Sequence, residues 1–251
     1  MPYPMLVISF VCYFSSVSFA ILGSMLSFFV PYETCNMMKN AGKKVFTKMT
    51  SFFSLIFFLF SFGLIFFTES EFFGLYMTSG FIFLSLFLFI LPWILLLFII
   101  GKEGGLERIF NSYGILLLFL PAFFAMNVIY ASGVELFLFF VLGTKIGDIG
   151  AYVIGVSTNK LMKNGNHKMI PSISPGKSWE GAAGGLFFSI LFSVLMYKFA
   201  FPDFTYGIWF PIVLGAVLFV FGAAGDLAES CIKRTCGIKD SGHTIPGIGG
   251  V

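Results

Sequence analysis

The sequence predicts an all-α fold, a polytopic bundle of transmembrane helices, and three observations lead to this prediction. Of the 251 residues, 58% are hydrophobic and 11% are charged, and the mean hydropathy is +0.96. A soluble domain has about 25% charged residues, so this chain cannot cover its apolar surface in water. Phenylalanine alone occurs 37 times, which suits helices that face lipid. Long apolar stretches also recur along the whole chain.

About 20 mostly apolar residues are needed for a helix to cross a bilayer. The stretch 72–100 is long for one span and short for two, and a tilt or a break at Pro92 would accommodate it. About seven spans are expected, at 6–30, 52–67, 72–100, 112–130, 134–155, 182–199 and 208–226.

The distribution of basic residues predicts how these spans are oriented. Lysine and arginine occur in the loops 31–51, 101–111 and 156–181 and in the tail 227–251, and are missing from the alternate loops, which carry Glu69, Glu71 and Asp203. Cytoplasmic loops are enriched in basic residues. We therefore expect an inner-membrane protein with its N-terminus outside and its C-terminus in the cytoplasm.

The predicted organisation has two parts, the N-terminal transmembrane helices 1–133 and a C-terminal transmembrane catalytic region 134–251 with cytoplasmic motif loops. No basic residue precedes the first apolar run, which favours a retained span over a cleaved signal. Small-residue patterns at Gly143–Gly147 and Gly181–Gly185 would allow helices to pack closely. In a glycine-rich chain, chance explains such patterns equally well.

Asp148 and Lys145 are ionisable residues inside a predicted span, where charge is costly and marks candidate functional positions. They are one helical turn apart, so they can partly neutralise each other. The pair is either a structural ion pair within the bundle or part of a functional site. A proton or ion pathway through a transporter is the alternative that this pair supports.

The segment Gly225–Arg234 continues the last span, and the helix is expected to end at Gly237. On a helix, Asp226, Ser230 and Lys233 lie along one stripe. A metal ion on a carboxylate beside lysine and arginine is typical apparatus for phosphate transfer. The glycine-rich residues 237–250 could offer backbone N–H groups to phosphate. A charged helix end that is simply solvated is the other interpretation.

Three segments resemble motifs of the phosphatidate cytidylyltransferase family. Ile173–Gly181 (ISPGKSWEG) is similar to the family's I-S-P-K-K-T-W-E-G, and Gly147–Tyr152 (GDIGAY) is similar to its D-T-G-A-Y. The tail 226–251 resembles the signature S-x-x-K-R-x4-K-D-x5-P-x-H-G-G. Residues that match the signature are Ser230, Lys233, Arg234, Lys239, Asp240, Pro246, Gly247, Gly249 and Gly250. The resemblance covers about residues 140–251.

The resemblance implies a membrane enzyme of phospholipid biosynthesis that transfers CMP from CTP to phosphatidate, giving CDP-diacylglycerol and pyrophosphate. It implies Mg²⁺ on Asp226 and leaves a second cation open; a homodimer is also left open, and no nucleic acid is expected. The implied catalytic residues are Asp226, Asp148, Lys233 and Asp240. The implied substrate-binding residues are Lys177, Ser178, Glu180, Ser230, Arg234, Lys239 and His167, the last of which is equally well explained as a solvated loop histidine.

The sequence departs from the family pattern in two ways. Ile248 stands where the family has histidine, and the chain stops at Val251, before the family's Asp-Arg-x-Asp and a further span. By resemblance, the Asp that follows would share metal binding with Asp226. We therefore expect the 251-residue form to insert into membranes and to turn over little CTP.

Overall fold

The computed structural model describes residues 15–66, 104–163, 165–200 and 207–238, together with helical positions between 80 and 94. Within these residues, six helices are long and apolar enough to cross a membrane. The chain is therefore a multi-pass, all-α membrane protein, as predicted. It forms two compact units that divide at Val134. The N-terminal unit contains α2, α3 and α5, and the C-terminal unit, Glu135–Thr235, contains α6, α7, α8 and a β-hairpin.

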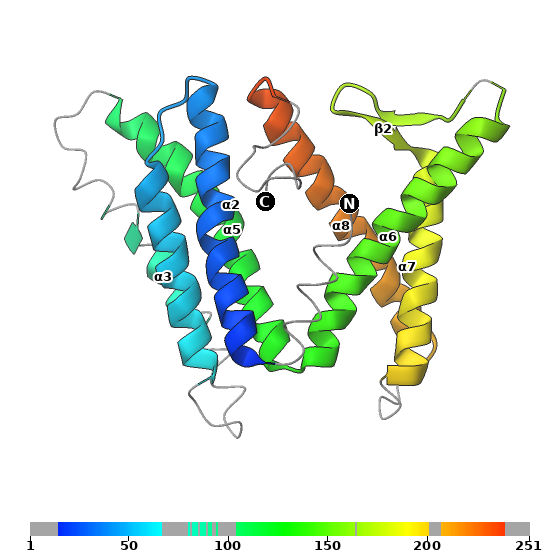
Figure 1. Ribbon diagram of the computed structural model, residues 1–251, viewed down its shortest axis with the longest axis horizontal. Coiled ribbons are helices and arrows are strands. Elements are labelled where there is room, and N and C mark those ends of the chain that lie inside the picture. The colour runs from blue at the N-terminus through cyan, green and yellow to red at the C-terminus, as the bar shows by residue number, and fades with distance from the viewer. Residues whose placement is uncertain are drawn as a thin grey trace. The chain divides into compact units, whose positions relative to one another are not determined.

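The N-terminal unit packs three long helices side by side, α2 (Ser16–Asn40), α3 (Thr47–Phe66) and α5 (Gly105–Ala131) (Figure 1). The Ser15 hydroxyl caps α2 by accepting a hydrogen bond from the Val17 N–H at 3.1 Å. After α2 the chain turns at Gly42, whose φ of +79° favours glycine.

Several predicted span boundaries were wrong. The stretch 6–30 was expected to end before Pro31, but α2 continues through Pro31 to Asn40. The apolar run ends near residue 30, yet the helix goes on, and Pro31, Glu33 and Thr34 in this continuation are buried. Helix α5 also extends beyond its predicted span, because it begins at Gly105 whereas the span was predicted to begin at residue 112. The predicted span 72–100 and residues 1–14 lie largely or wholly outside the described residues.

Aromatic rings fill the core of the N-terminal unit. Phe19 of α2 stacks on Tyr130 of α5, with ring centroids 3.8 Å apart and planes within 5°. Phe57 of α3 lies in a buried cluster with leucines of α5 and of the helical positions near 84 and 91. One buried polar clasp interrupts this packing, because the Asn127 amide donates to the Ser61 hydroxyl at 2.8 Å and to the Phe58 carbonyl at 3.3 Å.

The C-terminal unit consists of α6 (Val134–Leu161), β1 (Lys168–Ile170), β2 (Ser174–Ser178), α7 (Trp179–Ala200) and α8 (Trp209–Thr235). The two strands pair antiparallel between the end of α6 and the start of α7 (Figure 1). We expected only a loop here and missed the hairpin, because neither strand shows alternating apolar residues. The expected continuation of the last span was correct, since α8 ends at Thr235 and Gly237 has φ +71°.

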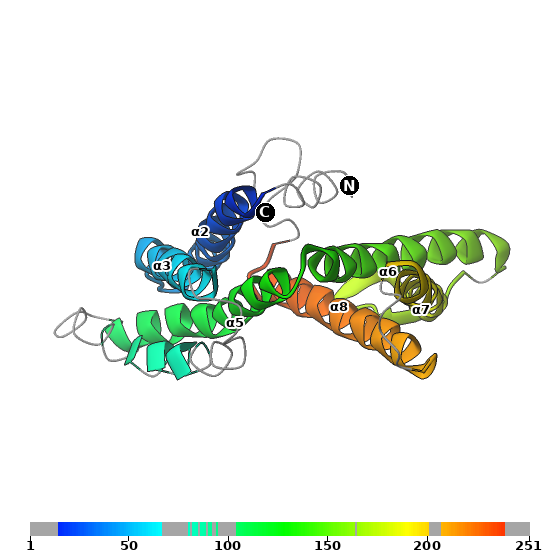
Figure 2. The same ribbon diagram turned by 90° about the horizontal axis from the view of Figure 1, so that it is seen from below.

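Glycines bring α6 and α7 into backbone contact. A Cβ on Gly181 would lie 2.8 Å from the Ala151 carbonyl oxygen, and one on Gly185 would lie 2.8 Å from the Gly147 carbonyl oxygen. Only glycine permits an approach this close. The first half of α8 packs against α7, and Figures 1 and 2 show the two helices crossing there. The predicted small-residue pattern Gly181–Gly185 is therefore a real helix contact.

Candidate active site

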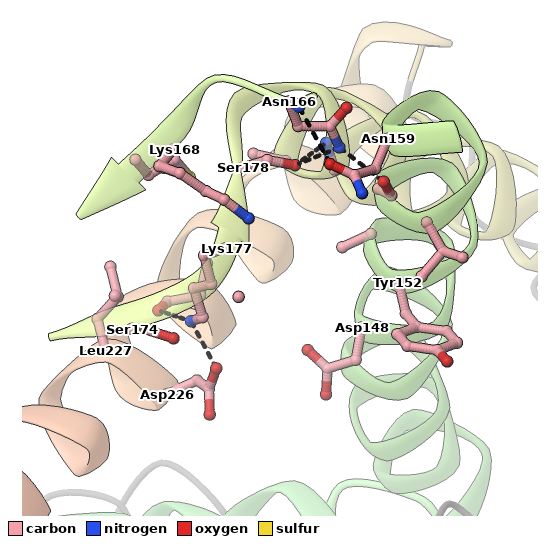
Figure 3. Close-up of a pocket in the computed structure, with 18 of the residues that line it drawn as sticks. Asp148, Tyr152, Asn159, Asn166, Lys168, Ser174, Lys177, Ser178, Asp226 and Leu227 are labelled. Atoms are coloured by element: carbon pink, nitrogen blue, oxygen red, sulfur yellow. Dashed lines mark hydrogen bonds and ion pairs between the residues drawn. The ribbon is translucent and has the colours of Figure 1, made fainter. Parts of the chain in front are cut away.

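A cavity of about 770 Å³ opens within the C-terminal unit. Its walls come from α6, from both strands of the hairpin, from the first turn of α7 and from the middle of α8 (Figure 3). Charged side chains share the lining with apolar ones such as Tyr152 and Phe219. The charged residues that line it are Asp148, Lys160, Lys168, Lys177 and Asp226.

Lys177 and Asp226 form an ion pair across the cavity wall, with Nζ 2.5 Å from Oδ2 (Figure 3). The Lys177 ammonium also donates to the Ala223 carbonyl of α8 at 3.4 Å. These two residues are 49 positions apart in the sequence, as their numbers give. The pair therefore joins two of the segments that resemble family motifs, the one on β2 and the one on α8.

An irregularity in β2 explains how Lys177 reaches the cavity. Lys168 pairs with Ser178, and Ile170 pairs with Ser174. The segment between these pairs is therefore two residues longer on β2 than on β1. Adjacent residues on a regular strand point to opposite faces. The extra residues bend the strand locally, and both Lys177 and Ser178 line the cavity as a result.

Asp148 faces the cavity from α6, opposite Asp226 (Figure 3). Its Oδ2 lies 3.2 Å from the Lys145 ammonium, so the predicted neutralising pair forms. The Asp148 side chain is 56% exposed and that of Lys145 is 35% exposed. The protein therefore does not enclose this ion pair within the C-terminal unit.

Ser178 is 5% exposed, and its hydroxyl accepts hydrogen bonds from the Gly181 N–H at 3.1 Å and from the Asn166 amide at 3.2 Å. The first of these contacts caps the start of α7. Asn166 also donates to the Gly155 carbonyl of α6 at 2.6 Å, and its backbone N–H donates to the Asn159 side chain at 3.1 Å. The sequence reasoning missed both asparagines, because Asn159 lies in the last turn of α6, Asn166 lies in the loop after it, and neither belongs to a motif.

His167 and Glu180 bind each other, with Nδ1 2.6 Å from Oε1, and the His167 N–H donates to the same oxygen at 3.2 Å. This clamp ties the start of the hairpin to the first turn of α7. The second carboxylate oxygen of Glu180 is buried without a hydrogen-bond partner among the described residues. Neither residue lines the cavity.

The remaining predicted residues of α8 lie beyond the cavity lining. Lys233 pairs with Glu229 at 2.5 Å, one turn back on the same helix. Arg234 donates from Nε to the Ile173 carbonyl at 3.3 Å, which fastens the end of α8 to the hairpin turn. Ser230 lies one turn before Lys233 and Arg234 on α8 and is half-buried. Lys239 and Asp240 lie outside the described residues.

The acidic side chains of the cavity have the donor chemistry that Mg²⁺ requires. No group of three or more acidic, histidine or cysteine side chains comes together among the described residues. Two carboxylates, Asp148 and Asp226, face one cavity beside lysines. Mg²⁺ is usually bound through one or two carboxylates while waters and substrate phosphates complete its shell. The two aspartates therefore fit Mg²⁺ in the presence of a phosphorylated substrate.

The sequence matches the cytidylyltransferase family over residues 3–251. The family match thus begins far before residue 140, and the narrower extent expected from the motifs was an underestimate. Neither this match nor the relatives described below support the transporter alternative.

Curated relatives include the phosphatidate cytidylyltransferases of Staphylococcus saprophyticus and Staphylococcus haemolyticus, each 40% identical to the chain over 121 residues. The enzyme of Staphylococcus epidermidis is 42% identical over 121 residues. Each alignment covers 48% of the chain and 44% of the relative. The chain thus spans less than half the length of these curated relatives.

Proposed function

The chain belongs to the cytidylyltransferase family, and from that premise we propose that it transfers CMP from CTP to phosphatidate, forming CDP-diacylglycerol and pyrophosphate. The relatives that it resembles are phosphatidate cytidylyltransferases. The observation that carries the proposal is the cavity of the C-terminal unit, where Asp148, Lys177 and Asp226 gather from the three motif-bearing segments.

The proposed reaction is an in-line displacement at phosphorus. A phosphate oxygen of phosphatidate forms a bond to the α-phosphorus of CTP, and the bond from that phosphorus to the bridging β-phosphate oxygen breaks. The bonding electrons leave with pyrophosphate. Both substrates are anions, so positioning and charge neutralisation are the main tasks of the protein in such a transfer. Lys177 is held at the cavity wall by Asp226 and is suited to bind a phosphate there.

Asp226, with Asp148 opposite, would hold Mg²⁺ when substrate is present. A bound Mg²⁺ would supply charge neutralisation on the phosphates that react. The Lys177–Asp226 ion pair would keep the carboxylate oriented before substrate enters. A second cation remains an open part of this proposal.

The other predicted residues take supporting parts in the proposal. Lys233 and Arg234 would bind phosphate at the end of α8, with Ser230, Lys239 and Asp240 in the same segment. Glu180 and His167 would position the hairpin through their mutual hydrogen bonds. Apolar lining from Tyr152 and Phe219 suits the part of phosphatidate that lies nearest its headgroup. No nucleic acid is needed, and a homodimer is left open.

We further propose that the cavity faces the cytoplasm from the inner membrane. Basic side chains gather at the end of the C-terminal unit that holds the hairpin, namely Lys160, Lys163, Lys168, Lys177, Lys233 and Arg234. Positive residues mark cytoplasmic ends. With Cys236 as the single cysteine, an impermeant maleimide should label inverted vesicles and leave intact cells unlabelled. Labelling of intact cells would reverse the orientation.

The function is tested by adding radiolabelled CTP and phosphatidate to membranes and looking for labelled CDP-diacylglycerol. Two forms are compared: the 251-residue chain, and an extended form carrying Asp-Arg-x-Asp and one more span, as the family pattern implies. Mg²⁺-dependent label in the lipid product from the extended form is the expected result. Ion flux without CTP turnover, measured in liposomes, would contradict the proposal.

A further inference from the structure

Three lysines and two aspartates line the cavity, and the charges are not evenly paired. Asp226 is paired with Lys177, and Asp148 is paired with Lys145, which is not part of the lining. Lys160 and Lys168 form no ion pair or side-chain hydrogen bond among the described residues. The lining therefore contains two ammonium groups whose charge is not compensated by a neighbouring carboxylate.

We propose that Lys160 and Lys168 form a second phosphate-binding element of the cavity, distinct from Lys177, that holds a phosphate group of one of the two substrates. The proposal rests on the proposed function, because both CTP and phosphatidate bring a phosphate into this cavity. Lys160 approaches from the last turn of α6, and Lys168 is the first residue of β1. In Figure 3 the Lys168 side chain extends toward the space that Asp148 also faces.

The segment that carries Lys168 is held in place by contacts on both sides. The Asn166 side chain donates to the Gly155 carbonyl of α6, and the Trp179 N–H donates to the His167 carbonyl at 3.0 Å. Lys168 itself pairs with Ser178 across the hairpin. A lysine on a fixed backbone loses less freedom on binding than one on a free loop, which favours ligand binding.

A solvated pair of lysines near the membrane surface is the competing explanation, and Lys163 provides a control for it. Lys163 lies in the turn that follows α6, between Lys160 and Lys168 in the sequence; it is exposed and does not line the cavity. A substitution there removes the same charge from the same end of the unit. A specific phosphate site must respond to Lys160 and Lys168 and not to Lys163.

The test measures equilibrium binding to the purified 251-residue chain by titration calorimetry. The probes are CTP, dioctanoyl phosphatidate, and dioctanoylglycerol, which has the same acyl chains without phosphate. The variants are Lys160→Gln, Lys168→Gln and Lys168→Arg, with Lys163→Gln as control. Thermal unfolding of each variant in detergent establishes that it is folded.

Each glutamine variant is expected to raise the Kd of one phosphorylated probe about tenfold, the effect of losing one charge-assisted contact. A rise for CTP assigns the site to the nucleotide, and a rise for phosphatidate assigns it to the lipid headgroup. Dioctanoylglycerol should bind all variants equally, and Lys168→Arg should bind like the original chain. The proposal is overturned if Lys160→Gln and Lys168→Gln each bind CTP and dioctanoyl phosphatidate with the same Kd as the control Lys163→Gln.

Failure of the proposed function gives a different pattern. If the extended form makes no CDP-diacylglycerol while the Lys168-dependent binding persists, the reaction is wrong and the phosphate site stands. If product forms and the lysine variants bind both probes normally, the reaction stands and the site is wrong.

Discussion

The two units of this chain pack their helices by different means. In the N-terminal unit, rings such as Phe19 and Tyr130 fill the space between helices, and the polar clasp of Asn127 is buried. In the C-terminal unit, Gly181 and Gly185 let α6 and α7 meet at the backbone. The charged cavity lies beside this glycine contact, since Ala151 and Gly181 also belong to its lining.

This difference in packing suggests a division of tasks, in which the N-terminal unit contributes mainly to stability and the C-terminal unit carries the proposed chemistry. Aromatic side chains adapt to one another, so many sequences can build the N-terminal unit. A glycine contact allows no such repacking, because any side chain meets backbone. In the C-terminal unit, backbone contact replaces side-chain packing between α6 and α7. This close contact fixes the positions of the elements that carry Asp148, Lys177 and Asp226 around the cavity.

The largest effect is expected from Asp226→Asn, tested in the extended form. The change keeps the shape of the side chain and removes the charge that pairs with Lys177 and is proposed to bind Mg²⁺. Turnover of CTP should fall at least about 100-fold, the scale of losing a key electrostatic group, and excess Mg²⁺ should not restore it.

Glu135→Gln is the control for that change, because Glu135 is an exposed carboxylate in the first turn of α6 and does not line the cavity. It should keep turnover within a few-fold of the original. Near-normal turnover in Asp226→Asn would assign Asp226 a structural part only.

Gly185→Ala sharpens the comparison between the two kinds of packing. The added Cβ would lie 2.8 Å from the Gly147 carbonyl oxygen and would overlap a ring carbon of Phe219. We expect a loss of about 1–3 kcal/mol in the free energy of unfolding, as for other overpacked sites, and a lower rate of CTP turnover. Denaturant titration in mixed micelles and the lipid-product assay measure the two effects.

The same substitution at Gly114 of the N-terminal unit is the control, since among the described residues no atom beyond the adjacent backbone of its own helix lies within 4 Å of a Cβ there. It should stabilise the protein by about 0.5–1 kcal/mol, because alanine favours helix over glycine. If both variants behave alike, tight glycine packing is not what distinguishes the units.

Asn127→Ala should show that the N-terminal unit supports stability more than chemistry. The change removes two buried hydrogen bonds to α3, at Phe58 and Ser61, while the Ser61 hydroxyl keeps its own hydrogen bond to the Phe58 carbonyl. The expected cost is about 1–3 kcal/mol of unfolding free energy, with kcat/KM for CTP unchanged at temperatures where the variant is folded. Asn111→Ala, which removes a more exposed hydrogen bond to Lys44, should cost less.

Particular residues show how much of the structure the sequence could predict. Hydropathy predicted the helical membrane bundle, and charge spacing predicted the Lys145–Asp148 pair, because both depend on local pattern. The helix boundaries were less well predicted, since α2 continues through Pro31 where buried polar residues replace apolar ones. The roles of the predicted site residues remain predictions.

The pairing of Lys177 with Asp226 and the hairpin that makes it possible were not predicted. The hairpin register depends on an irregularity in β2, and the contact joins residues far apart in sequence. Asn166 carries no motif, and its importance appears only where its amide meets α6 and β2. Such positions are fixed by tertiary contacts, which local sequence patterns do not encode.

The central claim, that the nucleotide binds in the cavity of the C-terminal unit, is tested most directly by cysteine protection. Ala223 of α8 lines the cavity, and the native Cys231 on the same helix is exposed and outside the lining. In a chain with Ala223→Cys and with Cys231 kept as its other cysteine, saturating CTP with Mg²⁺ should slow maleimide labelling at position 223 and leave Cys231 unaffected. Equal labelling at position 223 with and without CTP, in protein that binds CTP, would contradict the account.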